Sequence, residues 1–199
     1  KDGWFEVQDA GSQLIIAATQ LHANDKVVVD YCAGNGGKTL AIISKLYELN
    51  NNATVWAHDV KEMRLAQLRG SLSRVGVPNN DTRIQVLTTS CAEVDFYDEM
   101  ADVVLVDAPC SSSGVLRRRP SHRWELTQET IEHDLPRLQL EILKNASLLV
   151  KPGGRLIYAT CSLCHCENEK VAASWERNES FASLWEPWVF HCSETWPIE

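Results

Sequence analysis

The sequence predicts an α/β fold, with a mostly parallel sheet flanked by helices. Short apolar, β-branched runs alternate along the chain with longer segments of helical periodicity, which is the pattern of strand–helix–strand units. The runs at 26–31 (KVVVDY) and 101–107 (ADVVLVD) are almost uninterrupted, as expected of strands buried on both faces. The 199 residues suffice for a sizeable core, and we expect residues 1–199 to form one domain.

The first half of the chain alternates regularly between strand and helix. Apolar residues on one helical face predict a leading helix over 9–22. The predicted strands of this half are 26–31, 54–59, 84–88 and 101–107. The predicted helices between them are 38–49 and 61–75.

The second half opens with a long loop, 108–126, which is rich in Ser, Arg and Pro. Loops of this length in a compact domain are usually functional. Apolar spacings of three and four predict a helix from 135 to 149, with Pro136 near its start or kinking it. The elements predicted after it are a sharp turn at 151–154 (KPGG), a strand over 155–160, a helix over 167–176 and a strand near 184–190.

Charge and cysteine content limit the classes of function. The net charge of −8, from 19 basic and 27 acidic residues, argues against a domain that holds nucleic acid by bulk charge. Four arginines nevertheless fall within seven residues, and they form either a solvated loop or a phosphate-binding cluster: Arg117, Arg118, Arg119 and Arg123. Seven scattered cysteines favour a reducing compartment over a disulfide framework. No apolar run reaches about 18 residues, so we expect no transmembrane helix.

The turn after the first strand, DYCAGNGGKT at 30–39, is rich in glycine. Glycines let a backbone approach a ligand closely and turn into a helix N-terminus. A P-loop would need Gly where Cys32 stands, and a dinucleotide fingerprint would need Gly where Thr39 stands, so both are excluded. An S-adenosylmethionine site and a tight turn without ligand remain.

Asp59 ends the second strand, 23 residues after Gly36. An acidic side chain at this place can accept hydrogen bonds from the two ribose hydroxyls of a nucleoside cofactor. It can equally cap the following helix. The residue supports a nucleoside cofactor without identifying which one.

Two cysteines follow neighbouring strands. Cys110 stands in DAPCSSSGVLRRRP after the fourth strand, close to Asp107, and Cys161 ends the fifth. In a parallel sheet both thiols lie at the carboxyl edge, where ligands bind in open α/β folds. A thiol there suits carbon 5 of a pyrimidine, which becomes nucleophilic only when a group adds at carbon 6.

A zinc site is the competing interpretation of these cysteines. The possible ligands are Cys161, Cys164, His165 and Cys166, with His191 and Cys192 later in the chain. A second paired Cys-x-x-Cys is absent. We therefore expect no metal, and we interpret Cys164 and Cys166 as packing residues.

Taken in order, the motifs resemble the catalytic domain of the NOL1/NOP2/Sun (RsmB-type) family of RNA cytosine-5 methyltransferases. The matching segments are VQDAGSQL, DYCAGNGGKT, the Asp59–Arg64 pair, DAPCSSSGVLRRRP, the 139–143 helix, KPGGRLIYATCS and ENE, from about Gly3 to Asn178. The resemblance implies a Rossmann-like class I S-adenosylmethionine-dependent methyltransferase fold.

The resemblance also implies roles for individual residues. Cys161, which follows Thr in the motif after the fifth strand, would be the nucleophile, and Cys110 would assist release of the methylated product. The implied contacts with S-adenosylmethionine are Cys32, Ala33, Gly34, Asn35, Gly36, Gly37, Lys38, Asp59, Arg64 and Asp107.

The chain departs from the family pattern in two respects. Ser90 stands where the family commonly has an Asp that reads the adenine amine. The family's last strand and its upstream RNA-binding segment have no counterpart here, so we expect a fragment truncated at both ends, without the last strand.

The expected reaction is transfer of a methyl group to carbon 5 of an unstacked cytosine in rRNA or tRNA. Asp107 would hydrogen-bond the ring nitrogen, and the four arginines would hold phosphates. DNA cytosine-5 methylation is disfavoured, because its nucleophile follows Pro. A non-catalytic, S-adenosylmethionine-binding scaffold in ribosome assembly stays open. We expect an intracellular, reducing location: nucleolus or nucleus in a eukaryote, otherwise cytoplasm.

Overall fold

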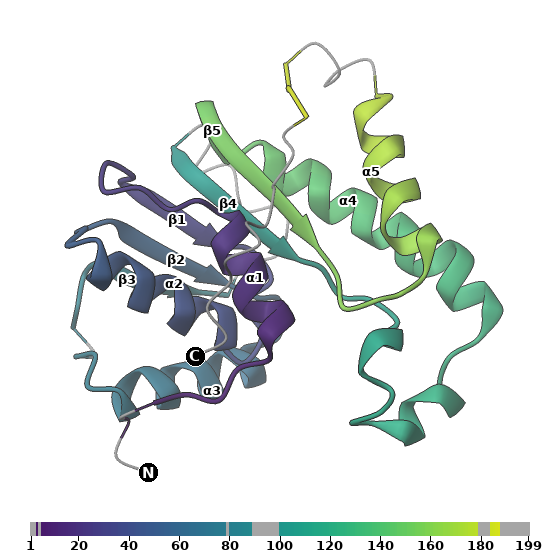
Figure 1. Cartoon of the computed structure of the whole chain (residues 1–199), viewed down its shortest axis with the longest axis horizontal. Coiled ribbons are helices and arrows are strands. Elements are labelled where there is room, and N and C mark those ends of the chain that lie inside the picture. The colour runs from purple at the N-terminus through teal and green to yellow at the C-terminus, as the bar shows by residue number, and fades with distance from the viewer. Residues whose placement is uncertain (1–2, 4, 79, 89–99, 179–183, 188–199) are drawn as a thin grey trace.

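The computed structural model describes residues 3, 5–78, 80–88, 100–178 and 184–187. Its centre is a parallel sheet of five strands in the order β3-β2-β1-β4-β5 (Figure 1). The strands are β1 (Val27–Asp30), β2 (Thr54–His58), β3 (Ile84–Leu87), β4 (Ala101–Asp107) and β5 (Val150–Ala159). The α-helices are α1 (Ala10–Ala18), α2 (Gly37–Glu48), α3 (Glu62–Arg74), α4 (Leu135–Ser147) and α5 (Glu169–Glu176). The predicted α/β class and its parallel sheet are confirmed.

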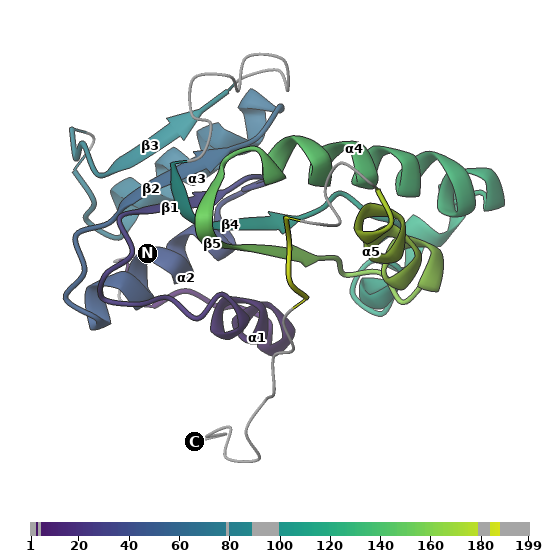
Figure 2. The same cartoon turned by 90° about the horizontal axis from the view of Figure 1, so that it is seen from above.

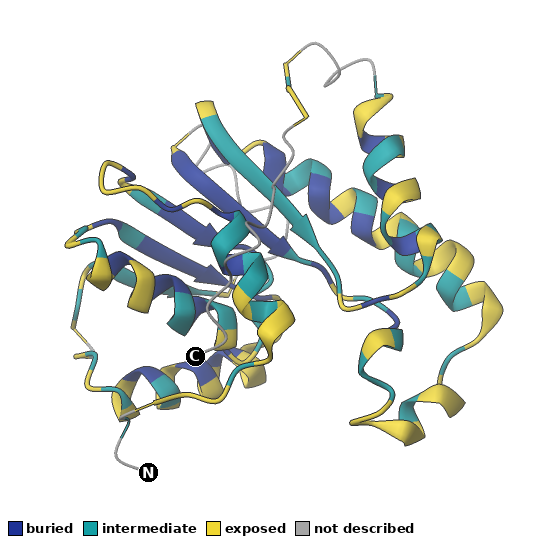
Figure 3. Ribbon diagram, viewed as in Figure 1, coloured by how far each residue is buried: buried dark blue, intermediate teal, exposed yellow. Residues whose placement is uncertain are grey.

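Helices cover both faces of the sheet, with α1 and α2 on one side and α4 on the other (Figure 2). Successive strand residues point to opposite faces, and the two hydrophobic cores divide accordingly. Val28 and Val103 pack with α1, α2 and α3, whereas Val29 and Val104 pack with α4 and α5. The central strands are therefore buried along most of their length (Figure 3), which explains their uninterrupted apolar sequences.

Two predicted elements differ from the structure. The segment 151–154 was expected to be a sharp turn, yet it belongs to β5, which begins at Val150. Its pairing shifts register, because Ala101 pairs with Val150 while Val103 pairs with Arg155. The extra residues bulge from the ladder, and Gly153 adopts a left-handed φ of 77° there. A strand was also expected near 184–190; residues 184–187 form none, and 188–190 lie outside the described residues.

Pro136 lies at the second position of α4, directly after a π-helical turn at Thr130–Asp134. The Leu135 N–H bonds the Thr130 carbonyl in the π pattern, but Pro136 has no N–H for the next carbonyl, that of Ile131. The Cys166 thiol donates to this carbonyl instead, at 3.3 Å. Burial raises the pKa of Cys166, which keeps the thiol in its donating form. Cys166 is thus a structural residue, as predicted.

Asp102 connects the amino ends of three neighbouring strands. Its Oδ2 accepts the N–H groups of Lys26 (2.8 Å) and Val27 (2.9 Å), and its Oδ1 pairs with Lys151. The starts of β1, β4 and β5 are fixed together by this one carboxylate. In the described part of the chain, no helix is long and apolar enough to cross a membrane.

The core prediction concerns Leu105, which is fully buried on β4. Leu105→Ala should lower the free energy of unfolding by about 3 kcal/mol, because it leaves a cavity at the centre of the sheet. Denaturant unfolding followed by circular dichroism measures the change. Leu138→Ala on α4, where the side chain is 42% exposed, is the control and should cost less than about 1 kcal/mol. Equal losses would contradict the assignment of the core.

Candidate active site

The predicted site residues gather beyond the carboxyl ends of β1, β2, β4 and β5, where the arrowheads of Figure 1 point. This is the edge at which open α/β sheets bind ligands. Each of these strands contributes residues at or just after its end: the turn 31–36, Asp59, the segment that begins with Asp107, the last residue of β4, and the segment from Thr160. The topology therefore brings together motifs that are far apart in sequence.

The glycine-rich turn is held by backbone contacts. Gly34 and Gly36 have left-handed φ angles of 56° and 91°, which favour glycine. A Cβ on Gly36 would lie 2.3 Å from the Leu68 side chain, so α3 packs directly against the turn. The Ala33 N–H donates to the His58 carbonyl at 2.8 Å, fixing the turn to the end of β2.

Asp59 joins this turn to α3. Its side chain is 6% exposed; Oδ2 accepts the Gly34 N–H at 3.0 Å and Oδ1 accepts the Lys61 N–H at 2.8 Å. Arg64 lies 3.7 Å away, so the Asp59–Arg64 pair expected from the family pattern is present. Asp59 thus contacts the residue before α3, but the N-cap of the helix is Lys61, and it has no side-chain cap hydrogen bond. The helix-cap interpretation of Asp59 is therefore wrong. Its role toward a ribose stays a prediction.

Asp30, the last residue of β1, is a feature that sequence reasoning passed over. The side chain is fully buried; Oδ2 accepts the Thr39 hydroxyl at 2.7 Å, while Oδ1 has no hydrogen-bond partner. Burial raises the pKa of this carboxyl to about 7. The available signal was its position as the first residue of the glycine-rich motif.

Lys38 and Asp107 form an ion pair at 2.5 Å. Lys38 begins α2 just after the turn, and Asp107 ends β4, so the pair connects the predicted cofactor segment with the cysteine-bearing segment. Their side chains are only 15% and 28% exposed. The Lys38 ammonium is therefore already paired with the Asp107 carboxylate.

Cys110 and Cys161 are both free thiols, and their sulfurs lie 3.3 Å apart. The hydrogen bond from Cys110 is the main reason that the pKa of Cys161 is lowered to about 6. The Ser112 hydroxyl, 3.5 Å from the sulfur, and the Lys38 charge act in the same direction; burial and Asp107 oppose them. The pKa of Cys110 is raised well above its usual range, because it is the donor to Cys161 and is buried. The two pKa shifts have opposite directions, so Cys161 ionises before Cys110.

The backbone around the thiols is tightly constrained. The Gly114 N–H donates to the Cys161 carbonyl at 2.9 Å, and a Cβ on Gly114 would lie 2.6 Å from that carbonyl oxygen. Ser112 adopts a left-handed φ of 54°, an uncommon conformation that often accompanies functional sites. The absence of a side chain at Gly114 therefore allows the two cysteine segments to approach each other.

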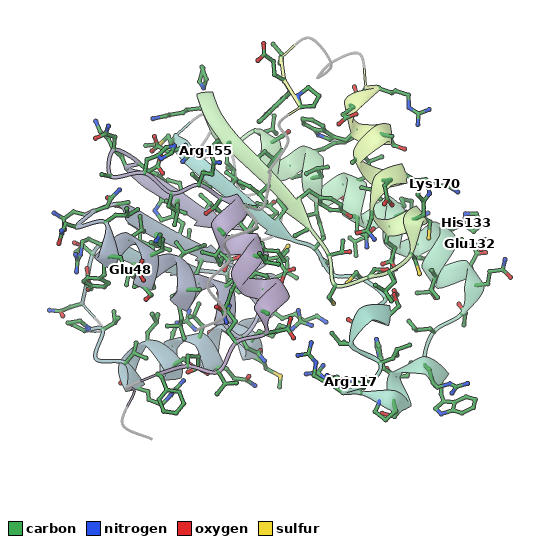
Figure 4. The ribbon with its side chains drawn as sticks, in the orientation of Figure 1. Glu48, Arg117, Glu132, His133, Arg155 and Lys170 are labelled. Atoms are coloured by element: carbon green, nitrogen blue, oxygen red, sulfur yellow. The ribbon has the colours of Figure 1, made fainter. Side chains whose placement is uncertain are left out.

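The four arginines are exposed. Arg117, Arg118 and Arg119 lie between two short helices, Ser113–Val115 and Pro120–Trp124, and Arg123 lies within the second; Figure 4 labels Arg117. Arg118 pairs with Asp9 at 2.8 Å, which ties the segment to the start of α1. Arg123 stacks over the Trp124 ring at 4.7 Å, and Trp124 is 79% exposed. Phosphate binding by these arginines stays a prediction, and Arg118 already has a structural partner.

Some predictions fall where the structure says less. Ser90 lies outside the described residues, as do His191 and Cys192. Within the described part, no group of three or more His, Cys, Asp and Glu side chains is arranged to hold a metal ion.

The fold, a five-stranded parallel sheet with helices on both faces, is the Rossmann-like fold of S-adenosylmethionine-dependent methyltransferases. NSun6 from Pyrococcus horikoshii, solved with SFG, superimposes with a TM-score of 0.75 at 28% identity, over 88% of this chain and 43% of that one. A methyltransferase homologue from Pyrococcus horikoshii gives a TM-score of 0.69 at 30% identity, over 88% of this chain and 52% of that one.

Residues 17–189 match the family model described as 16S rRNA methyltransferase RsmB/F. The chain belongs to this family, which confirms the resemblance drawn from its motifs. It is 37% identical over 186 residues to the ribosomal RNA small subunit methyltransferase B of Enterobacter sp. (strain 638). That alignment covers 92% of this chain and 41% of the relative, so the chain spans about two fifths of the length of the curated relative.

The contact at Gly114 gives a direct test of the geometry. Gly114→Ala should displace the Cys161 backbone, separate the two sulfurs and slow alkylation of Cys161 by iodoacetamide at pH 6.5 several-fold, since the thiolate is the reactive form. Peptide mass spectrometry assigns the rate to Cys161. Gly70→Ala, where an added Cβ meets nothing within 4 Å, is the matched control. An unchanged rate in folded Gly114→Ala protein would refute the constraint.

Proposed function

We propose that this chain is the catalytic core of an S-adenosylmethionine-dependent RNA methyltransferase that methylates carbon 5 of cytosine through a covalent Cys161 intermediate. The observation that carries the proposal is the pair of free thiols, 3.3 Å apart at the carboxyl edge of the sheet. One thiol is disposed to ionise and attack, and the other to remain protonated. This division suits addition to carbon 6 of a pyrimidine, followed by assisted elimination.

The turn after β1 fits a nucleoside cofactor. Gly34 is partly exposed and Gly37 is exposed, and they lie between Asp59 and the Lys38–Asp107 pair. The space where a Cβ on Gly37 would stand is open. Residues 32–38, Asp59, Arg64 and Asp107 would hold S-adenosylmethionine, which when bound supplies an electrophilic methyl group. A relative, NSun6, was solved with SFG, an analogue of this cofactor. A contribution from Ser90 completes the proposed set.

The residues of the chain supply the remaining chemistry. The Cys161 thiolate forms a bond to carbon 6, and the electron pair of the C5–C6 double bond moves toward carbon 5. Asp107, in its protonated form or through a water molecule, would hydrogen-bond the ring nitrogen that gains charge, and Lys38 lies 2.5 Å from Asp107. Once carbon 5 carries the methyl group and a base has taken its proton, the carbon–sulfur bond breaks and its electron pair returns to Cys161. Cys110 assists this release.

RNA is the substrate class that the relatives favour. The curated relatives are named for the small ribosomal subunit, so we propose small-subunit rRNA ahead of tRNA as the substrate. The target cytosine must leave its stack to reach a thiol held close to the sheet edge. We place the reaction in a reducing intracellular compartment, because a pair of thiols this close must stay reduced to act.

Covalent trapping tests the proposal. The protein, S-adenosylmethionine and small-subunit rRNA fragments are mixed, and a denaturant-resistant protein–RNA adduct is sought on gels. Cys110→Ala should accumulate the adduct, because elimination is slowed, whereas Cys161→Ala should form none. Cys164→Ala, which removes a free thiol outside both the reacting pair and the proposed cofactor site, is the control for cysteine loss.

The alternatives give different patterns. An adduct that requires Cys110 would reverse the nucleophile assignment, as in DNA cytosine-5 methylation. No adduct with any variant, together with measurable S-adenosylmethionine binding, would favour a scaffold.

The phosphate role of the arginine segment is tested by salt dependence. Arg123→Ala should weaken RNA binding and reduce the slope of log affinity against log salt by about 0.7, the value for one phosphate contact with a single strand. Fluorescence anisotropy at several salt concentrations measures both. Arg137→Ala, at an 82% exposed arginine on α4, is the matched control. Equal slopes for both variants and the unaltered protein would remove Arg123 from the RNA interface.

A further inference from the structure

We propose that Glu167 is a positioning residue that sets the separation of the two active-site sulfurs, because its buried carboxylate binds the segments that carry both cysteines. Glu167 lies in the short turn His165–Glu167 before α5. Its contact with the reaction is indirect, through the residues next to Cys110 and Cys161. The inference rests on the proposed roles of those two cysteines.

The Glu167 side chain is fully buried, and both of its carboxylate oxygens accept hydrogen bonds. Oε2 accepts the Ser111 N–H at 2.8 Å and the Gln139 side-chain amide at 2.9 Å, and Oε1 accepts the Ser162 hydroxyl at 2.6 Å. Burial acts to raise the pKa of this group, but the hydrogen bonds from Ser111, Ser162 and Gln139 together hold it below its usual range. A buried anion with three donors is a rigid anchor, since losing any donor leaves charge unpaired.

The donors are the immediate neighbours of the two thiols. Ser111 follows Cys110 and Ser162 follows Cys161, and both are buried. Gln139 donates also to the Pro109 carbonyl at 3.0 Å, so Cys110 is fixed on both sides. One carboxylate therefore joins the segment after β4 to the segment after β5, beyond the last ladder pair of the two strands, Asp107 with Ala159.

The anchor is itself fixed to the sheet and to α4. The Tyr158 hydroxyl on β5 donates to the Glu167 backbone carbonyl at 2.7 Å, and the fully buried Gln139 belongs to α4. The Ser111 and Ser162 hydroxyls are 3.1 Å apart and complete the network. Such a network can maintain the 3.3 Å sulfur separation while the thiols face the substrate.

Two modes of action of Glu167 predict opposite signs. If Glu167 acted by charge alone, neutralising it would favour the Cys161 thiolate and lower the pKa of Cys161. If it positions the Cys110 donor, breaking the network would remove the hydrogen bond that stabilises the thiolate and raise that pKa. The direction of the change separates positioning from simple electrostatics.

The experiment is the pH profile of Cys161 alkylation by iodoacetamide in the whole chain, with peptide mass spectrometry to isolate Cys161. Glu167→Leu, which keeps bulk but removes both acceptors, should raise the midpoint by about one pH unit and slow alkylation near pH 6 roughly fivefold, as the thiolate fraction falls. Glu167→Gln keeps an acceptor for Ser111 and Gln139 and should restore most of the rate. Glu169→Gln, at the exposed first residue of α5, should leave the profile unchanged.

Two further variants keep the proposal testable. Ser162→Ala replaces Glu167→Leu if that variant does not fold. It removes the Ser162 hydroxyl, which donates to Glu167, contacts the Ser111 and Ser113 hydroxyls and accepts the Cys164 N–H, and it should shift the midpoint upward by a smaller amount. In a Cys110→Ala background the effect of Glu167→Leu should vanish, because the donor is already gone. A midpoint that falls equally in Glu167→Gln and Glu167→Leu, or an unshifted midpoint in folded Glu167→Leu, would overturn the inference. The assay uses neither RNA nor S-adenosylmethionine, so its outcome is independent of covalent trapping.

Discussion

The in-register parallel pairing of β4 with β5 is the constraint on which the rest of the site depends. Val106 pairs with Tyr158 and Asp107 with Ala159, and the Ala108 N–H extends the ladder to the Ala159 carbonyl. Cys110 and Cys161 therefore leave the sheet at the same height. A slip of one residue would turn each strand's side chains to the opposite face. The one register shift between these strands lies at their amino ends, between Ala101 and Val103, away from the thiols.

The four acidic side chains at the carboxyl edge of the sheet differ in what surrounds their carboxyl groups. Asp30 has a pKa raised to about 7 by burial, Asp107 is paired with Lys38, Asp59 accepts backbone N–H groups, and Glu167 is surrounded by donors. The negative charge of the chain is thus stabilised locally where it faces the site. A thiolate on Cys161 can form beside these acids because Cys110 donates to it directly.

Chemically identical cysteines serve distinct purposes in this chain. Cys110 and Cys161 form a pair whose proton is unequally shared, whereas Cys166 donates to a carbonyl that Pro136 leaves without an amide partner. The difference lies in surroundings: serines, a lysine and a second thiol in one place, a helix backbone in the other. Arg118 is comparable, since its pairing with Asp9 sets it apart from its neighbours in the arginine segment.

The sequence by itself determined the α/β class, the order of the main elements, the family, and the two segments that carry thiols, because local periodicity and contiguous motifs are properties of neighbouring residues. The prediction of a sharp turn at KPGG was wrong. Its glycines are compatible with a turn or with a bulge, and only the pairing with β4 decides between them. Only the tertiary structure decided the 3.3 Å sulfur separation, the Lys38–Asp107 pair and the burial of Glu167. These are contacts between segments distant in the chain, and a sequence pattern fixes neither their distance nor the solvent exclusion that gives them their chemistry.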